Sequence, residues 1–237
     1  MSPEGRLHLR DEIRALERDA LAGLDLVADQ IDRTMRVVVD RDFEMADMVI
    51  ADDDRIDGRF LESHQEILTL IARQAPVATD LRLLAALLDV IRRIERMGDQ
   101  CVNICKVLLV APDPPDDDLG MTQRIIAMAR SARELTLESG KAFLAKDVAA
   151  AERLCEVDDR VDTLNREVFD LAVALAGDRD AREWAMRMTQ VARAIERIGD
   201  NAVDIGEETA FVASGVYREF QDASHPEPVP GDQGAGR

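Results

Sequence analysis

Apolar side chains recur every three or four residues near the start of the chain. The positions that follow this pattern are Ile13, Leu16, Ala20, Leu24, Val27, Ile31, Met35 and Val38. Such spacing gathers the apolar residues on one face of an α-helix, where they can pack against partner helices. We therefore expect a long amphipathic helix over residues 13–38.

Five further helices are predicted by the same periodicity, with short polar breaks between them. The first break is Asp40-Arg41-Asp42, and Pro76 is a residue type favoured in the first turn of a helix. The expected ranges are about 43–73, 76–110, 119–145, 148–176 and 179–215. Consecutive helices joined by such short breaks are expected to run antiparallel.

Residues 111–120, APDPPDDDLG, divide the chain into two similar halves. Their prolines and aspartates are typical of a connecting segment. DDRID, which starts at Asp53, recurs as DDRVD from Asp158, and IERMGD, which starts at Ile94, recurs as IERIGD from Ile195. We infer a duplication of one structural unit.

The predicted fold is all-α, with two tandem three-helix bundles made of six long antiparallel helices. The first bundle is expected over residues 1–113 and the second over residues 114–217. Residues 218–237 contain few side chains that a core would bury, so a disordered tail is predicted there.

Acidic residues recur in pairs, four residues apart, in both halves of the chain. The pairs are Asp53 with Asp57, Glu95 with Asp99, Asp158 with Asp162, and Glu196 with Asp200. On a helix this spacing leaves two side chains about 40° apart on one face. A solvated helix face tolerates one such pair easily, because the repulsion is only a few tenths of a kcal/mol.

Asp53 and Asp158 occupy positions of the apolar stripe, where the periodicity would place a hydrophobic residue. A carboxylate without a partner in such a place costs several kcal/mol, so it should be protonated or bind a cation. Carboxylates converging from two helices form a hard-ligand cluster suited to divalent or ferric ions, such as Fe, Zn, Mn or Mg. Asn103 and Asp204 continue the two stripes and could each add an oxygen ligand.

Neighbouring arginines offer an alternative that needs no metal. They are Arg55, Arg92 and Arg96 in the first half and Arg160, Arg193 and Arg197 in the second. Glycine recurs at one equivalent position, as Gly98 and Gly199, although it costs about 1 kcal/mol relative to Ala inside a helix. We expect it to permit close approach of a helix beside the acids.

The formal net charge is −18, which disfavours binding to nucleic acid or to anionic membrane surfaces. No stretch approaches the roughly 18 apolar residues that a membrane-spanning helix needs, so no insertion into a membrane is expected. The N-terminal residues MSPEGRLHLRDEIR contain no apolar segment typical of a signal peptide. The odd number of cysteines, 3, favours a reducing cytoplasm over a disulfide framework.

Several other kinds of site are disfavoured. A ferritin-like dimetal enzyme would need Glu-x-x-His on two helices, and none of the three histidines lies in the acidic motifs. Cys101 and Cys105 are four residues apart, but Cys155 has no matching partner, so buried small side chains are the preferred interpretation. No phosphate-binding glycine loop of the G-x-x-x-x-G-K-[ST] type occurs. No catalytic or cofactor-binding residue is therefore predicted.

The acidic repeats belong to two longer motifs, ARQAPVATDLRLLAALLDVIRRIERMGDQCVNI and its shorter echo VARAIERIGDNAVDI. Both motifs resemble the PhoU family of phosphate-signalling proteins. DRDFEMADMVIADDDRID, echoed by AKDVAAAERLCEVDDRVD, is similar to the family as well. The resemblance extends over about residues 10–215.

This resemblance implies two three-helix bundles whose acidic pairs hold multinuclear metal clusters, and an adaptor without catalytic activity. Members of the family repress the phosphate-starvation response by contacting the ATPase subunit of the phosphate ABC transporter and a membrane sensor histidine kinase. The resemblance also implies a cytoplasmic homodimer. Members of the family usually have Asn at the end of the acidic motif in both halves, and this chain has Asp204 at that position in the second half. The alternative function is a helical scaffold, or an accessory protein of another phosphate permease, whose acids are neutralised by arginines.

Overall fold

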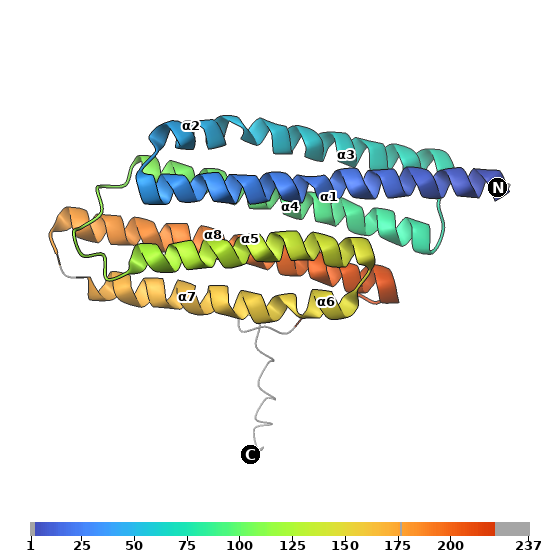
Figure 1. Cartoon of the computed structure of the whole chain (residues 1–237). Helices are drawn as coiled ribbons and strands as arrows, with labels where there is room; N and C mark the ends of the chain where they lie inside the picture. The colour runs from blue at the N-terminus through green and yellow to red at the C-terminus, as the bar shows by residue number, and fades with distance from the viewer. Residues whose placement is uncertain (1–2, 176, 221–237) are drawn as a thin grey trace, which may run out of the picture.

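The computed structural model describes residues 3–175 and 177–220. Within these ranges the chain is helical, without a β-strand (Figure 1). The helices are α1 (Pro3–Asp40), α2 (Phe43–Ala51), α3 (Asp53–Gln74), α4 (Thr79–Leu109), α5 (Met121–Ala145), α6 (Val148–Glu152), α7 (Leu154–Ala174) and α8 (Arg179–Ser214). None of the helices in the described residues is long and apolar enough to span a membrane.

The helices form two stacked bundles, α1–α4 and α5–α8 (Figure 1). α2 leads into α3, and α6 leads into α7, with a single non-helical residue between them, so each bundle consists of three long rods. One apolar stripe of each rod faces the core, which continues from one bundle into the other. The predicted all-α fold of two three-helix bundles is confirmed.

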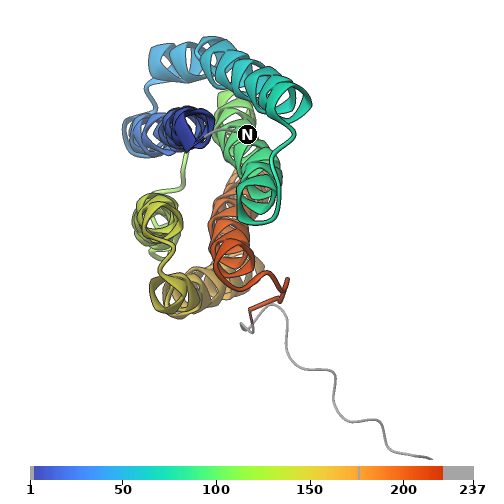
Figure 2. The same ribbon diagram turned by 90° about the vertical axis from the view of Figure 1, so that its right-hand side faces the viewer.

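The two bundles meet along two pairs of helices, α4 with α8 and α1 with α5 (Figure 2). α4 and α8 share the most extensive contact of any two helices. At the other pair, Arg133 on α5 donates to Asp32 on α1 over 2.8 Å, and Lys146 pairs with the buried Glu17. The α4–α8 contact brings the two IER motifs into the centre of the molecule.

Helix breaks are the main local difference from the expected ranges. The predicted helix 43–73 is interrupted at Asp52, and the predicted helix 148–176 is interrupted at Arg153. Asp42 and Asp147 cap α2 and α6, because each carboxylate accepts a hydrogen bond from a backbone N–H three residues later. Each bundle therefore carries a short capped helix ahead of its acidic motif.

Pro76 does not open the helix that follows it. Ala75 and Ala78 both have positive φ, 44° and 49°, and α4 begins only at Thr79. Positive φ is incompatible with a right-handed helix, so the turn between α3 and α4 delays the start of α4. The side chain of Pro76 is buried in this turn.

The chain folds back against α8 after the helix ends at Gly215, where φ is 81°. Phe220 is only 7% exposed, and its backbone N–H donates to Oε1 of Glu207 over 2.7 Å. The hydroxyl of Tyr217 donates to Oε2 of the same carboxylate over 3.1 Å. Of the predicted tail 218–237, residues 218–220 are therefore ordered against α8, and residues 221–237 lie outside the described residues.

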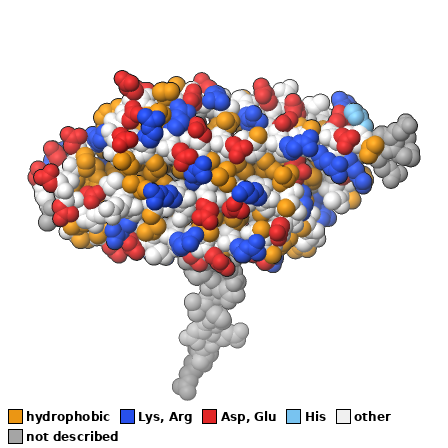
Figure 3. Space-filling view, in the orientation of Figure 1, with side chains coloured by type: hydrophobic (Ala, Val, Ile, Leu, Met, Phe, Trp, Pro, Cys, Tyr) orange, Lys and Arg blue, Asp and Glu red, His pale blue; other side chains and the backbone are white. Residues whose placement is uncertain are grey.

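Hydrophobic side chains gather on the surface along the line between the upper and the lower bundle (Figure 3). A groove of about 420 Å³ lies there, lined by Met35 and Val39 of α1 and by Ile126 of α5. Charged residues of both signs surround this strip, as Figure 3 shows. The apolar strip marks the outer edge of the α1–α5 contact.

Candidate functional site

The acidic pairs of each half face one another across two neighbouring helices. Asp53 and Asp57 project from α3 toward Glu95 and Asp99 on α4, and the second bundle repeats this arrangement with α7 and α8. We name the first group of four acids cluster 1 and the second group cluster 2. Cluster 2 consists of Asp158, Asp162, Glu196 and Asp200.

The two repeated glycines allow the neighbouring helix to pack closely beside the acids. A β-carbon added at Gly199 would lie 2.5 Å from Oδ1 of Asp158, which is far inside a normal contact. A β-carbon at Gly98 would lie 3.5 Å from Oδ1 of Asp53 and 2.9 Å from Cδ1 of Ile56. The expected role of glycine as a site of close approach is thus visible in both bundles, and it is tighter in cluster 2.

Cluster 2 has the geometry of a cation site. Asp158, Asp162 and Asp200 each offer one oxygen, and these oxygens all lie within 4.8 Å of one another. Ligands on opposite sides of a hard cation with metal–oxygen distances of about 2.0–2.6 Å are separated by about 4–5 Å. Asp158 and Asp162 are 1% and 4% exposed, so their charges are withdrawn from water. Their donor atoms therefore fit one or more hard cations.

Glu196 is the fourth acid of cluster 2 and is 5% exposed. Its Oε1 is paired with Arg193 and accepts a hydrogen bond of 3.4 Å from Nδ2 of Asn165. Its Oε2 is buried and accepts no hydrogen bond from the described residues. Burial, and then the nearby Asp200, raise the pKa of Glu196 to about 7. One oxygen of Glu196 is thus available to a cation.

Cluster 1 contains the same residue types in a more open setting. Asp53, Asp57 and Glu95 are half-buried, and Asp99 is exposed. Burial, and then Asp57 and Asp99, raise the pKa of Asp53 to about 6. Burial is also the largest cause that raises the pKa of Glu95 and of Asp99. These acids repel one another as a group, which a bound cation would relieve.

Gln30 of α1 is an additional polar residue at cluster 1. It is 3% exposed, its Oε1 accepts no hydrogen bond from the described residues, and this atom would lie 3.4 Å from a β-carbon at Gly98. The corresponding neighbour of Gly199 is Leu135. Gln30 lies between Val27 and Thr34 on the buried face of α1. Its position in the apolar stripe is the sequence signal from which a polar residue at this site could have been predicted.

Asn103 and Asp204, the two predicted ligands at the ends of the stripes, each lie on the side of their helix that faces the opposite bundle. Nη1 of Arg93 on α4 forms an ion pair of 2.5 Å with Oδ2 of Asp204 on α8. Asn103 is exposed and lines a groove between α4, α7 and α8. Both positions face the opposite bundle, because α4 and α8 are the helices that join the bundles.

Three of the six arginines named beside the clusters form ion pairs within the described residues. Arg193 pairs directly with Glu196, as the interpretation without metal requires. Arg92 instead pairs with Asp89 over 3.2 Å, and Arg160 pairs with Glu134 over 3.9 Å, and neither of these acids belongs to a cluster. A direct ion pair therefore supports the alternative at Glu196, whereas Arg92 and Arg160 have partners outside the clusters.

All three cysteines, Cys101, Cys105 and Cys155, are buried. Burial raises the pKa of Cys101 strongly and that of Cys105 to about 11, so both are thiols at neutral pH. Sγ of Cys105 lies 3.9 Å from the hydroxyl of Thr34. These surroundings agree with the interpretation of Cys101 and Cys105 as small buried side chains. His64 lies beside the ring of Phe60, with 5.7 Å between ring centroids, and belongs to neither cluster.

Comparison with known proteins gives one consistent family. The model of the PhoU domain matches residues 23–108 and again residues 125–209. The phosphate-specific transport system accessory protein PhoU homolog of Clostridium acetobutylicum is 26% identical over 213 residues, which cover 89% of this chain and 96% of that protein. PhoU homolog 1 of Mycobacterium leprae is 28% identical over 215 residues, which cover 87% of this chain and 90% of that protein.

Solved structures share the fold. The phosphate transport system regulatory protein PhoU from Streptococcus pneumoniae superimposes with a TM-score of 0.81 at 19% identity, over 90% of this chain and 100% of that one. PhoU from Pseudomonas aeruginosa superimposes with a TM-score of 0.76 at 22% identity, over 87% of this chain and 99% of that one. The two domain matches cover most of the chain, one in each half. The chain belongs to the PhoU family.

Proposed function

We propose that this protein is a regulatory adaptor of phosphate uptake that binds cations in its two carboxylate clusters. The main support is the repetition, in a member of the PhoU family, of four acids at the junction of two helices of each bundle. The similar proteins of Clostridium acetobutylicum and Mycobacterium leprae carry names that describe accessory proteins of phosphate-specific transport. In this role the protein lowers phosphate uptake and the phosphate-starvation response when phosphate is plentiful.

The proposed cation ligands of cluster 2 are Asp158, Asp162, Asp200 and Oε2 of Glu196. Those of cluster 1 are Asp53, Asp57, Glu95 and Asp99, with Gln30 as an added amide oxygen. A divalent or ferric ion would supply positive charge between two helices whose acids otherwise repel. The chain's own residues hold the helices at a fixed separation, through the close contact of Asp158 with Gly199. We assign the clusters a structural and regulatory role, without catalysis.

The proposed partners are the ATPase subunit of a phosphate ABC transporter and a sensor histidine kinase, and the protein is proposed to act in the cytoplasm as a homodimer. An adaptor of this kind needs rigid faces, and long helices packed along their whole length supply them. The apolar strip between α1 and α5 is one surface that a second copy or a partner could cover.

Deletion of the gene tests the regulatory proposal. Expression of phosphate-starvation genes and uptake of labelled phosphate should both remain high in phosphate-rich medium. Expression of the intact chain from a plasmid should restore repression. Normal repression in the deletion strain, together with no capture of a transporter ATPase or a sensor kinase by the purified protein, would refute it.

A scaffold without metal is the second candidate, and the ion pair between Arg193 and Glu196 favours it. In that case arginines neutralise the acids, and the same fold would serve another phosphate permease. Metal analysis of protein purified without chelator and without nickel-affinity resin separates the two candidates. Bound metal in stoichiometric amounts supports the first, and its absence supports the scaffold.

A further inference from the structure

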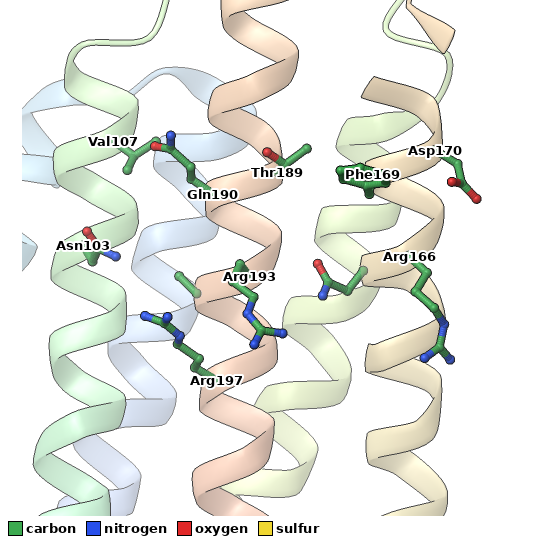
Figure 4. Close-up of a pocket in the computed structure, with 11 residues that line it drawn as sticks. Asn103, Val107, Arg166, Phe169, Asp170, Thr189, Gln190, Arg193 and Arg197 are labelled. Carbon is green, nitrogen blue, oxygen red and sulfur yellow. The ribbon is translucent and has the colours of Figure 1, made fainter. Parts of the chain in front are cut away.

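A groove of about 750 Å³ lies over α8, between α4 on one side and α7 on the other, in the size range of small-molecule sites (Figure 4). Arg193 and Arg197 line it from successive turns of α8, with Arg197 extending on the α4 side of the helix and Arg193 on the α7 side (Figure 4). The other lining residues include the amides of Asn103, Asn165 and Gln190 and the ring of Phe169. In a chain with a net charge of −18, a groove with this composition calls for an explanation.

The internal repeat explains why the groove is open and basic. IERMGD and IERIGD are 101 residues apart, and the same offset pairs residues of α4 at the α4–α8 contact with residues of α8. The related pairs are Asp89 with Gln190, Arg93 with Ala194, Asn103 with Asp204, and Val107 with Glu208. Three acids and an arginine on one side of the contact are thus replaced by uncharged residues on the other.

The charged side of the α4–α8 contact is occupied by its own residues. Arg93 and Asp204 form their ion pair there. Glu208 lies close enough to Asp89 and Arg93 for both to affect its pKa, which burial raises to about 7. On the groove side, the equivalent position is Ala194, and its small side chain leaves open the space that an arginine would fill. The groove side therefore has no counterpart of the Arg93–Asp204 ion pair, and Gln190 stands where Asp89 pairs with Arg92, the equivalent of Arg193.

The two arginines differ in how available they are. Arg197 is exposed, extends on the α4 side of α8 in Figure 4, and forms no ion pair within 4.0 Å in the described part of the chain, although it is close enough to Glu196 to lower the pKa of that acid. Arg193 is held by Glu196, so an incoming anion would compete with that carboxylate. Arg166 lines the edge, but its guanidinium donates to Oγ1 of Thr163 on the same helix over 3.1 Å. Asp170 is the one acid among the lining residues described for this groove.

We propose that the groove between α4, α7 and α8 binds the phosphoryl group of a small anion through Arg193 and Arg197. Guanidinium groups bind phosphate oxygens with two parallel hydrogen bonds, and the amides of Asn103 and Asn165 are additional donors. The ring of Phe169 is 60% exposed, and the groove is far larger than inorganic phosphate needs. These two features favour a nucleoside phosphate, whose base would stack on the ring.

Isothermal titration calorimetry of the full chain, in low salt with EDTA, tests this site with inorganic phosphate, ADP and adenosine. We expect phosphate and ADP to bind, ADP more tightly, and adenosine weakly. Arg197→Gln should weaken both anions about tenfold or more, because it removes charge-assisted hydrogen bonds. Arg197→Lys should give an intermediate loss, since it keeps the charge but not the fork. Arg96→Gln, at the equivalent position of the first half, should leave both affinities unchanged.

Two variants locate the ligand within the groove. Phe169→Ala should weaken ADP and leave inorganic phosphate unchanged. Glu196→Gln should tighten both anions, because it releases Arg193 from its competing carboxylate. Binding of phosphate without ADP would identify free phosphate as the ligand of the same site. No saturable binding of either anion at millimolar concentration would overturn the proposal. So would equal affinity for adenosine and ADP, or an equal loss from Arg96→Gln and Arg197→Gln.

Discussion

Cluster 1 and cluster 2 share residue types and spacing but differ in their surroundings. In cluster 2, Asp158, Asp162 and Glu196 are nearly inaccessible to water, whereas the acids of cluster 1 are half-buried or exposed. Cluster 1 has the amide of Gln30 where cluster 2 has the side chain of Leu135. Charges in a less polar environment interact more strongly with one another and with a cation. Duplication has thus preserved the acids, while packing has made the surroundings of the two clusters unequal.

Loss of metal should expose this inequality most clearly. A cation that binds only the folded state at 100 times its dissociation constant stabilises it by about 2.7 kcal/mol. Asp200→Asn and Asp99→Asn should each remove about half of the metal bound at saturation, and together nearly all of it. At limiting metal, Asp200→Asn should cause the larger loss, because cluster 2 is the more buried. Metal content per chain and thermal melts with Mn²⁺ measure both effects.

The same variants in EDTA separate a metal site from arginine ion pairs. If cations are the partners, the aspartates repel one another without metal, and each Asn variant should be as stable as the wild type or more stable. If arginines are the partners, each variant strands a positive charge and is destabilised with or without metal. Destabilisation that is unchanged by chelator would end the metal hypothesis.

Glycine substitutions compare the closeness of the two helix contacts. Gly199→Ala places a methyl group 2.5 Å from a buried carboxylate oxygen, and overpacking of this kind costs about 1–3 kcal/mol. Gly98→Ala meets mainly the flexible end of Ile56, at 2.9 Å, so the gain of about 1 kcal/mol in helix propensity offsets the strain. Urea unfolding in EDTA should show a loss for Gly199→Ala and little change for Gly98→Ala. Equal losses would mean that the two contacts are equally tight.

Stability of the metal-free protein should depend on pH through the raised acids. An acid with a higher pKa in the folded state than in the unfolded state binds its proton more tightly when folded, so its contribution falls as the pH rises between the two values. For Glu196 this window runs from 4.5 to about 7, and for Asp53 from 3.8 to about 6. The free energy of unfolding in EDTA should therefore decline less steeply in Glu196→Gln than in the wild type.

Asp53→Asn provides the comparison from cluster 1. It should flatten the same curve at lower pH and to a smaller extent, because Asp53 is less buried than Glu196. Urea unfolding at a series of pH values measures both variants. Parallel curves for Glu196→Gln and the wild type would contradict the raised pKa of Glu196.

The smallest expected effect concerns Gln30. Gln30→Leu gives cluster 1 the apolar neighbour that cluster 2 has in Leu135. It should weaken metal binding at cluster 1 a few-fold if the amide oxygen is a ligand, and leave cluster 2 unchanged. In EDTA it should raise stability slightly, because it removes a buried carbonyl oxygen without a hydrogen bond. Metal titration of Gln30→Leu in the Asp200→Asn background isolates cluster 1.

The sequence by itself determined the helical class, the duplication and the eight acids that converge in pairs. Helix periodicity is a local property, so the apolar stripe from Ile13 to Val38 could be predicted from the sequence. For the same reason the acidic pairs could be predicted, since residues four apart share one face of any helix. The PhoU resemblance and the long DDR and IER repeats led to the same two bundles. The start of α4 was missed because two residues with positive φ follow α3.

Only the tertiary structure decided what faces each acidic motif. Gln30 comes from α1, and its place beside Gly98 depends on how α1 packs on α4. Asp204 follows Asp200 by four residues, but its carboxylate forms an ion pair with Arg93 of the other bundle. The groove beside Arg197 is lined by Asn103 of α4 and Ala194 of α8, so it depends on how these two helices pack. Contacts between distant helices depend on packing of whole faces, which local spacing does not encode.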